Sequence, residues 1–249
     1  MFWFEPVWVK ENILPLFHGA NEIAEAAWKG RLINTTHFRP ELFVELKAGF
    51  INLFDRPQSW QWERGLSRIL HQHLILAFRY GIKDDRYLSF EEVRRALQNT
   101  DDAGRAEALR YLPILITSRS AWQKYGKIFL VEVWPRELRY LSHATTNSFL
   151  YLAEKVPQSF PSVVKLILPF LTTVKRCDTL FYRFRREPDS SMVTQYPDAM
   201  LVLLDKILAD HSIPPHQFDS LLNQIVESKP SLATDRRLRR LRRIAMEHI

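Results

Sequence analysis

The stretch FPSVVKLILPFL, residues 160–171, decides the fold class. Its proline falls in the first turn of a helix, where the missing N–H costs nothing and the fixed φ suits the helix. Apolar residues then cover most of the helix circumference, which is typical of a helix that neighbours cover on both sides. YPDAMLVLLDKIL, residues 196–208, repeats the pattern 36 residues further on.

This spacing lies between the lengths of tetratricopeptide and HEAT repeats. Two apolar helices separated by another helical segment and a polar loop favour a HEAT/TPR-like α-α superhelical array, in which neighbouring repeats enclose the inner helices. A buried helix pair in a compact α-bundle would give the same pattern, so the bundle remains the alternative.

Helix signals recur along the whole chain, and they predict an all-α fold of about a dozen helices. Prolines 6 and 40 suit first turns, Ser89 with Glu92 forms a capping box, and Asp101 suits the start of another helix. Further helices are expected over 59–80, 121–134, 146–156, 215–227 and 235–247, with caps near Ser59, Ser212 and Thr234. The segment 129–133, FLVEV, is rich in β-formers but lies inside helical spacing, so it is also predicted as helix.

Composition indicates one folded domain over residues 1–249. Hydrophobic residues make up 46% of the chain, enough to fill a sizeable core, and no segment reads as a disordered linker. Cys177 is the only cysteine, which excludes an intramolecular disulfide. The first residues lack the basic region of a secretory signal, and no apolar run is long enough to span a membrane, so we expect a cytoplasmic location.

Positive charge is concentrated near the C-terminus. The formal charge is +7, and RRLRRLRR, residues 236–243, holds six arginines, so the remaining chain carries only +1. Leu238, Leu241 and Ala245 share one face of the predicted basic capping helix 235–247 and are expected to pack on the preceding helix. The candidate binding residues are Arg236, Arg237, Arg239, Arg240, Arg242 and Arg243, for nucleic-acid phosphates or for an acidic protein surface; a solubilising cap is the third reading.

Motifs for catalysis and cofactor binding are absent from the sequence. There is no G-x-G, no G-K-[ST] and no G-x-S-x-G, which argues against nucleotide and serine-hydrolase sites. His71 and His73 are two residues apart, so on a helix they point about 200° apart and cannot share a metal ion. Glu45 and Lys47 lie on an amphipathic helix with no earlier aspartate, which favours a solvated face. We therefore expect no enzyme activity, no metal and no cofactor.

Tryptophan is abundant, with seven residues. Most are expected in the core. Trp60 and Trp62 in QSWQWE cannot both face one core from a helix, so one of them is a candidate partner contact.

Several phrases together resemble a known group of proteins: VWVKENILPLF at 7–17, AAWKG at 26–30, DDAGRAEAL at 101–109, VEVWPRE at 131–137 and the two stretches quoted first. In that order they are similar to the helical C-terminal region of large prokaryotic proteins, often linked to anti-phage defence, that carry sirtuin-like or signal-transducing NTPase modules upstream. The similarity runs from Val7 to Ala245. It implies an array that recognises a trigger or holds an assembly together, either as part of a larger chain or beside a separate effector.

Sequence alone therefore predicts a non-catalytic helical-repeat scaffold or sensor that binds a protein partner, an effector or a trigger protein, in a prokaryotic defence system. The alternative is a nucleic-acid-binding helical domain that uses the arginine-rich helix. An enzyme whose polar groups converge from distant helices is the third possibility.

Overall fold

A computed structural model of the chain describes residues 6–19, 22–34, 38–55, 64–176, 192–215 and 217–247. Most of these residues are helical, which confirms the predicted all-α class. The chain forms two compact units, one of Met1–Tyr111 with Glu132–Pro135 and one of Leu112–Val131 with Arg136–Ile249. The superhelical array and the single domain over 1–249 stay predictions.

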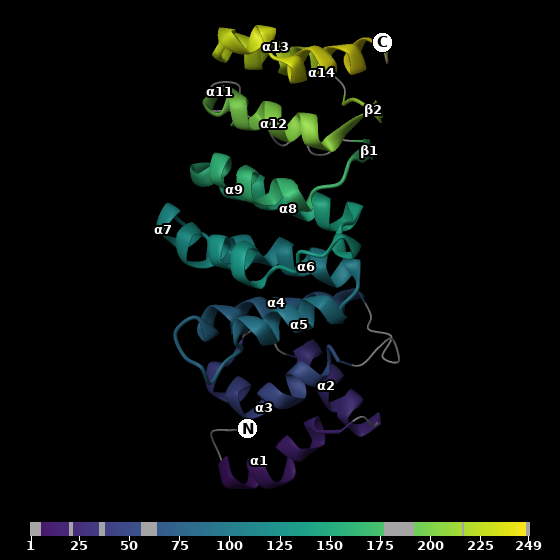
Figure 1. Cartoon of the computed structure of the whole chain (residues 1–249). Helices are drawn as coiled ribbons and strands as arrows, with labels where there is room; N and C mark the ends of the chain where they lie inside the picture. The colour runs from purple at the N-terminus through teal and green to yellow at the C-terminus, as the bar shows by residue number, and fades with distance from the viewer. Residues whose placement is uncertain are drawn as a thin grey trace. The chain divides into compact units, whose positions relative to one another are not determined.

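The first unit is built from six α-helices and a 3₁₀ turn in its described part (Figure 1). These are α1 (Pro6–Asn12), η1 (Leu14–Phe17), α2 (Glu22–Asn34), α3 (Pro40–Asn52), α4 (Arg64–Gly81), α5 (Phe90–Asn99) and α6 (Asp102–Tyr111). The η1 turn packs on α1, α2 and α3, and α4 packs on α2, α3, α5 and α6. Because it touches four helices, α4 is the centre of this unit.

Three predicted helix starts of the first unit are confirmed, at Pro40, Ser89 and Asp101, whereas the predicted cap near Ser59 lies outside the described residues. Pro40 opens α3. Ser89 Oγ accepts from the Glu92 backbone N–H at 3.2 Å, while Glu92 Oε2 accepts from the Ser89 N–H at 2.7 Å, which completes the capping box. Asp101 Oδ1 accepts from the Gly104 N–H at 2.7 Å and starts α6.

The second unit contains helices of all three kinds and a short sheet. Its helical elements are η2 (Leu112–Leu115), α7 (Arg119–Ala121), η3 (Trp122–Lys127), η4 (Phe129–Val133, whose last two residues belong to the first unit), η5 (Leu138–Tyr140), α8 (His143–Lys155), η6 (Pro157–Ser159), α9 (Phe160–Ile167), η7 (Leu168–Phe170), α11 (Met192–Gln195), α12 (Pro197–Ile207), α13 (Phe218–Ser228), η8 (Pro230–Thr234) and α14 (Arg236–Met246). In Figure 1 the pairs α8 with α9, α11 with α12, and α13 with α14 form successive layers.

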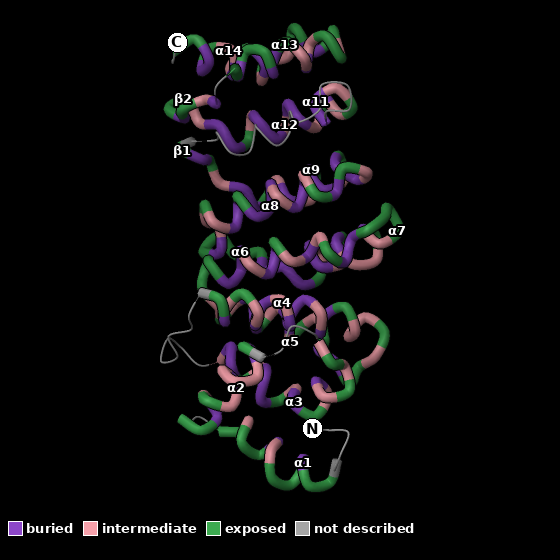
Figure 2. The backbone as a smooth tube through the Cα atoms, turned by 180° about the vertical axis from the view of Figure 1, so that it is seen from behind, coloured by how far each residue is buried: buried purple, intermediate pink, exposed green. Residues whose placement is uncertain are grey.

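The two repeated stretches form α9 and α12, as predicted. α9 packs between α8 and α12, and α12 packs between α9 on one side and α13 and α14 on the other. Most positions of α12 are buried (Figure 2). Because each helix has neighbours on two sides, its nearly continuous apolar surface is covered.

Two short parallel strands were not predicted. β1 (Val174–Arg176) pairs with β2 (Leu208–Ile213), with Val174 opposite Leu208. Ser212, predicted as a helix cap, lies in β2 instead: its buried hydroxyl donates to the Val174 carbonyl at 2.7 Å and accepts from the Ala209 N–H at 2.9 Å. The serine therefore joins the strands, and α13 begins after Gln217, which has a φ of 64°.

The segment 129–133 is helical, as predicted, but it is part of two consecutive π-helical stretches, η3 and η4. The Trp122 ring packs against Gly126, where a Cβ would overlap the ring, and its Nε1–H donates to Ser162 Oγ at 3.1 Å. The helical spacing of the segment indicates a helix, but it carries no signal for the wider π turn.

Candidate functional site

The arginine-rich helix α14 has one buried and one exposed face. Leu238, Leu241, Ile244 and Ala245 are buried, and α14 packs on α12 and α13, so the predicted docking face is confirmed. The cap is Asp235, one residue after the predicted Thr234: its Oδ1 accepts from the Arg237 N–H at 2.8 Å. The apolar spacing thus turns the arginines away from the core.

Arg237 is used in capping the helix. Its Nε–H and Nη2–H donate to the two carboxylate oxygens of Asp235 at 3.0 and 2.7 Å. These side-chain hydrogen bonds lower the pKa of Asp235 to about 2. Arg237 therefore belongs to the start of its own helix and offers little to a ligand.

Arg240 reaches across to α12. Its Nε–H donates to Asp205 Oδ1 at 2.8 Å and its Nη1–H to Asp210 Oδ1 at 3.0 Å. Its Nη2 group donates to the carbonyls of Asp205 and Leu208 at 2.6 and 2.8 Å. The last carbonyls of a helix have no partner within it, so Arg240 is a side-chain cap for the C-terminus of α12.

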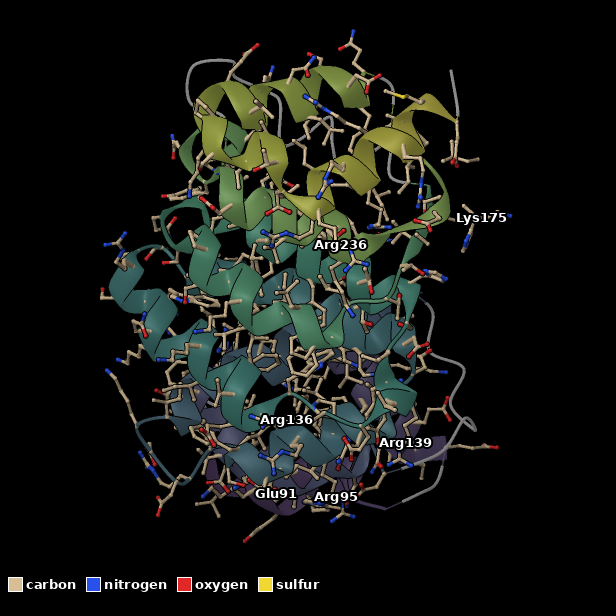
Figure 3. The ribbon with its side chains drawn as sticks, turned by 45° about the horizontal axis from the view of Figure 1, so that its top comes forward. Glu91, Arg95, Arg136, Arg139, Lys175 and Arg236 are labelled. Atoms are coloured by element: carbon tan, nitrogen blue, oxygen red, sulfur yellow. The ribbon has the colours of Figure 1, made fainter. Side chains whose placement is uncertain are left out.

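The other four arginines are more loosely held. Arg243 lies 3.4 Å from Asp210 and 3.9 Å from Glu247, and Arg242 donates to Asn223 at 3.3 Å. Arg236 and Arg239 are exposed, and their side chains form no ion pair or hydrogen bond within the described part of the chain. Figure 3 shows Arg236 at the start of α14.

An open hollow of about 420 Å³ lies along α14. Its lining residues are Arg236, Arg239, Arg240 and Arg243. These four arginines are spaced three, four and seven residues from the first, so their side chains share one face of the helix. The hollow is therefore a concentration of guanidinium groups on the surface of the second unit.

A second feature, missed by the sequence reasoning, is an apolar stripe on α2 of the first unit. Ala24, Trp28 and Leu32 are buried on one face. A second set of apolar or small residues, which we call the α2 stripe, lies on the opposite face, about 180° around the helix at 3.6 residues per turn. Its members are Ile23, Ala26, Gly30 and Ile33.

The α2 stripe is open to solvent. Ile23 is 60% and Ile33 63% exposed, and a Cβ at Gly30 would meet no atom within 4 Å. Val7 and Trp8 of α1 are exposed as well. In the sequence, residues 22–34 carry apolar residues on two opposite faces of a possible helix, but no helix was predicted there.

Other residues singled out from the sequence have structural surroundings. Glu45 is exposed, as expected, and pairs with Lys10 at 2.6 Å. Lys47 is half-buried, contrary to the expectation of a solvated face: it pairs with Glu92 at 2.9 Å and donates to the Tyr87 carbonyl at 2.7 Å. Cys177, Trp60 and Trp62 lie outside the described residues. The candidate contacts at the two tryptophans therefore stay predictions.

His71 and His73 are both buried on α4 and do not converge. His71 Nδ1–H donates to the Ser67 carbonyl at 2.6 Å, so its Nε2 accepts from Thr100 Oγ1 at 2.9 Å. His73 packs against the ring of Phe38. Within the described ranges no group of three or more His, Cys, Asp or Glu side chains could hold a metal ion, and no helix there is long and apolar enough to cross a membrane.

Comparison with known proteins gives one distant relative to report. No family model matches the chain, and no solved structure matches it. A protein of Sinorhizobium fredii (strain NBRC 101917 / NGR234), described as uncharacterized protein y4cA, is 28% identical over 135 residues. The match covers 52% of this chain and only 11% of that protein, so about half of the chain is similar to a small part of a much longer relative.

Proposed function

We propose that this chain is a non-catalytic helical-repeat scaffold or sensor that binds a protein partner. The observation that carries the proposal is the α2 stripe, where two isoleucines more than half exposed lie opposite the buried face of the same helix. Exposed apolar surface of this kind marks protein interaction sites. Ala26 and Gly30 between the isoleucines would let a partner backbone approach closely.

The packing of two helices supports a repeat architecture, and the source of the relative is compatible with a prokaryotic setting. α9 and α12 are each enclosed by neighbouring helices, which is the position of inner helices in an array. The relative from Sinorhizobium fredii is a far longer bacterial protein. A setting in prokaryotic defence and a cytoplasmic location are part of the proposal; the defence setting rests on the phrases that resemble the helical regions of defence-associated proteins.

Affinity capture from the host cells tests this function. Tagged full chain, treated with nuclease, should retain a discrete partner protein, and Ile23→Asp with Ile33→Asp should abolish the retention. Leu138→Asp is the matched control, because Leu138 is an exposed apolar residue of the second unit, at 81% exposure. Equal loss in the control, or retention unchanged by the α2 substitutions, would refute the proposed surface.

A further inference from the structure

The six arginines of α14 divide into two groups by what they contact. Arg237 donates to Asp235, the cap of α14, and Arg242 donates to Asn223. Arg240 has four of its five N–H groups directed at carboxylates and carbonyls, so it has little left to offer a ligand. All three are therefore engaged within the second unit, and Arg240 joins α14 to the neighbouring layer.

The remaining arginines are available to an external anion. The side chains of Arg236 and Arg239 form no hydrogen bond or ion pair with any residue that the structure describes. Arg243 is 61% exposed in its side chain, and its contacts with Asp210 and Glu247 are long. Since surface pairs of this kind contribute at most about 1 kcal/mol, an incoming anion can replace them.

Lining and shape of the hollow indicate the class of ligand. Guanidinium groups bind phosphate through paired N–H donors. Pockets for small molecules are enclosed and mostly apolar, whereas this hollow is open and lined by arginine. With no aromatic or aliphatic side chain among those lining residues, the surface suits recognition of phosphates without recognition of a base.

The length of the row matches a phosphate backbone. Arg236 and Arg243 are seven residues apart, about 10 Å along the helix axis. A nucleic-acid strand carries one phosphate in about 3.4 Å of axis, so the row spans about three phosphates. We propose that Arg236, Arg239 and Arg243 form a sequence-independent binding surface for the phosphodiester backbone of nucleic acid.

The neighbouring carboxylates make this surface weak. Asp205, Asp210, Asp235 and Glu247 lie among the six arginines and compensate much of their charge. Binding should therefore reflect about three phosphate contacts, with a slope of log K against log salt of about −2.7 for duplex DNA, and not the value near −5 that six contacts would give.

Fluorescence anisotropy with the full chain and a labelled duplex of arbitrary sequence, from 25 to 200 mM salt, measures this slope. Arg236→Gln with Arg239→Gln should reduce affinity at low salt at least 10-fold and bring the slope to about −0.9, which one remaining contact gives. The matched control is Arg237→Gln with Arg242→Gln, which removes the same charge from the same helix and should leave the slope within about 0.5 of the native value. Circular dichroism confirms that both variants fold.

Equal loss in both double variants would overturn the proposal, because it would show an effect of overall charge. Absence of binding at 25 mM salt, or a native slope near −5, would overturn it as well. Poly-glutamate that binds more tightly than the duplex would identify the surface as a site for acidic protein instead. Ile23→Asp with Ile33→Asp should leave DNA binding unchanged, so this result and that of the partner capture are independent.

Discussion

At the scale of single residues, two helical glycines offer a paired test of packing. Gly104 of α6 lies against His71 and Thr100, and a Cβ there would overlap both side chains. Gly104→Ala should destabilise the protein by about 1–3 kcal/mol through overpacking, although alanine is the better helix former. Urea denaturation measures the change.

Gly30→Ala is the control for that substitution. It is also in a helix interior, but the added Cβ meets no atom within 4 Å, so stability should rise by about 0.5–1 kcal/mol. A stabilising Gly104→Ala would show that the contact with His71 yields without cost.

The buried histidines should make stability depend on pH. Burial, with a smaller contribution from the charge of Arg31, lowers the pKa of His73 to about 4, and burial lowers the pKa of His71 too. The unfolded chain then binds more protons than the folded one below about pH 6.5. Stability should be complete above that pH and decline below it, by about 1.4 kcal/mol per pH unit for His73 down to about pH 4, with a further decline in the same direction from His71.

Denaturation midpoints at pH 7.5, 6 and 5 test this dependence. His73→Phe should make the decline clearly shallower, while substitution of the exposed His143 by glutamine should leave it as in the native chain. An unchanged decline in His73→Phe would contradict the assignment.

Sequence predicts residue roles where the interaction is local. Ser89 and Glu92 are three positions apart, and the capping box they form needs no other element. Ser212 has the same chemistry, yet its partner is the carbonyl of Val174, 38 positions away, and this long-range bond decides its role. Local pattern therefore gave the right function for one serine and the wrong one for the other.

At the scale of elements, Arg240 joins α14 to α12. Arg240→Gln leaves Asp205 unpaired and two helix-end carbonyls without their donor, so unfolding free energy should fall by about 1–2 kcal/mol. Arg240→Lys should recover only part of the lost free energy, because an ammonium group has three N–H donors on one nitrogen and cannot reach all four acceptors of the planar guanidinium group.

Arg239→Gln is the control for the Arg240 substitution, since Arg239 is exposed on the same helix. It should change stability by less than about 0.5 kcal/mol in the same urea titration. If the two glutamine variants were equally stable, Arg240 would not act as a cap.

Helix positions and buried faces follow from apolar spacing, as α9, α12 and α14 show. Which polar side chains of a helix are available to a ligand does not follow from apolar spacing. The six arginines are alike in sequence. Their roles are separated by the local contact of Arg237 with Asp235 and by the tertiary contacts of Arg240 with Asp205 and of Arg242 with Asn223. The α2 stripe was overlooked for a related reason: apolar residues at two phases weaken the single-face pattern by which an amphipathic helix is recognised.

At the scale of the whole molecule, each of the two compact units has its own core. Gly104→Ala lies in the first unit, so it should raise amide exchange in α4 and α6 more than in α12 and α13. Hydrogen exchange followed by mass spectrometry measures both regions in one sample. A uniform increase across the chain would indicate that the units unfold as one.

The contact between Arg240 and Asp205 also orders events during synthesis of the chain. The two residues are 35 positions apart. At about 5–20 residues per second, Arg240 is joined to the growing chain about 2–7 s after Asp205. Throughout that interval α12 has neither its side-chain cap nor the apolar face of α14, so this layer of the second unit closes only after α14 has been synthesised.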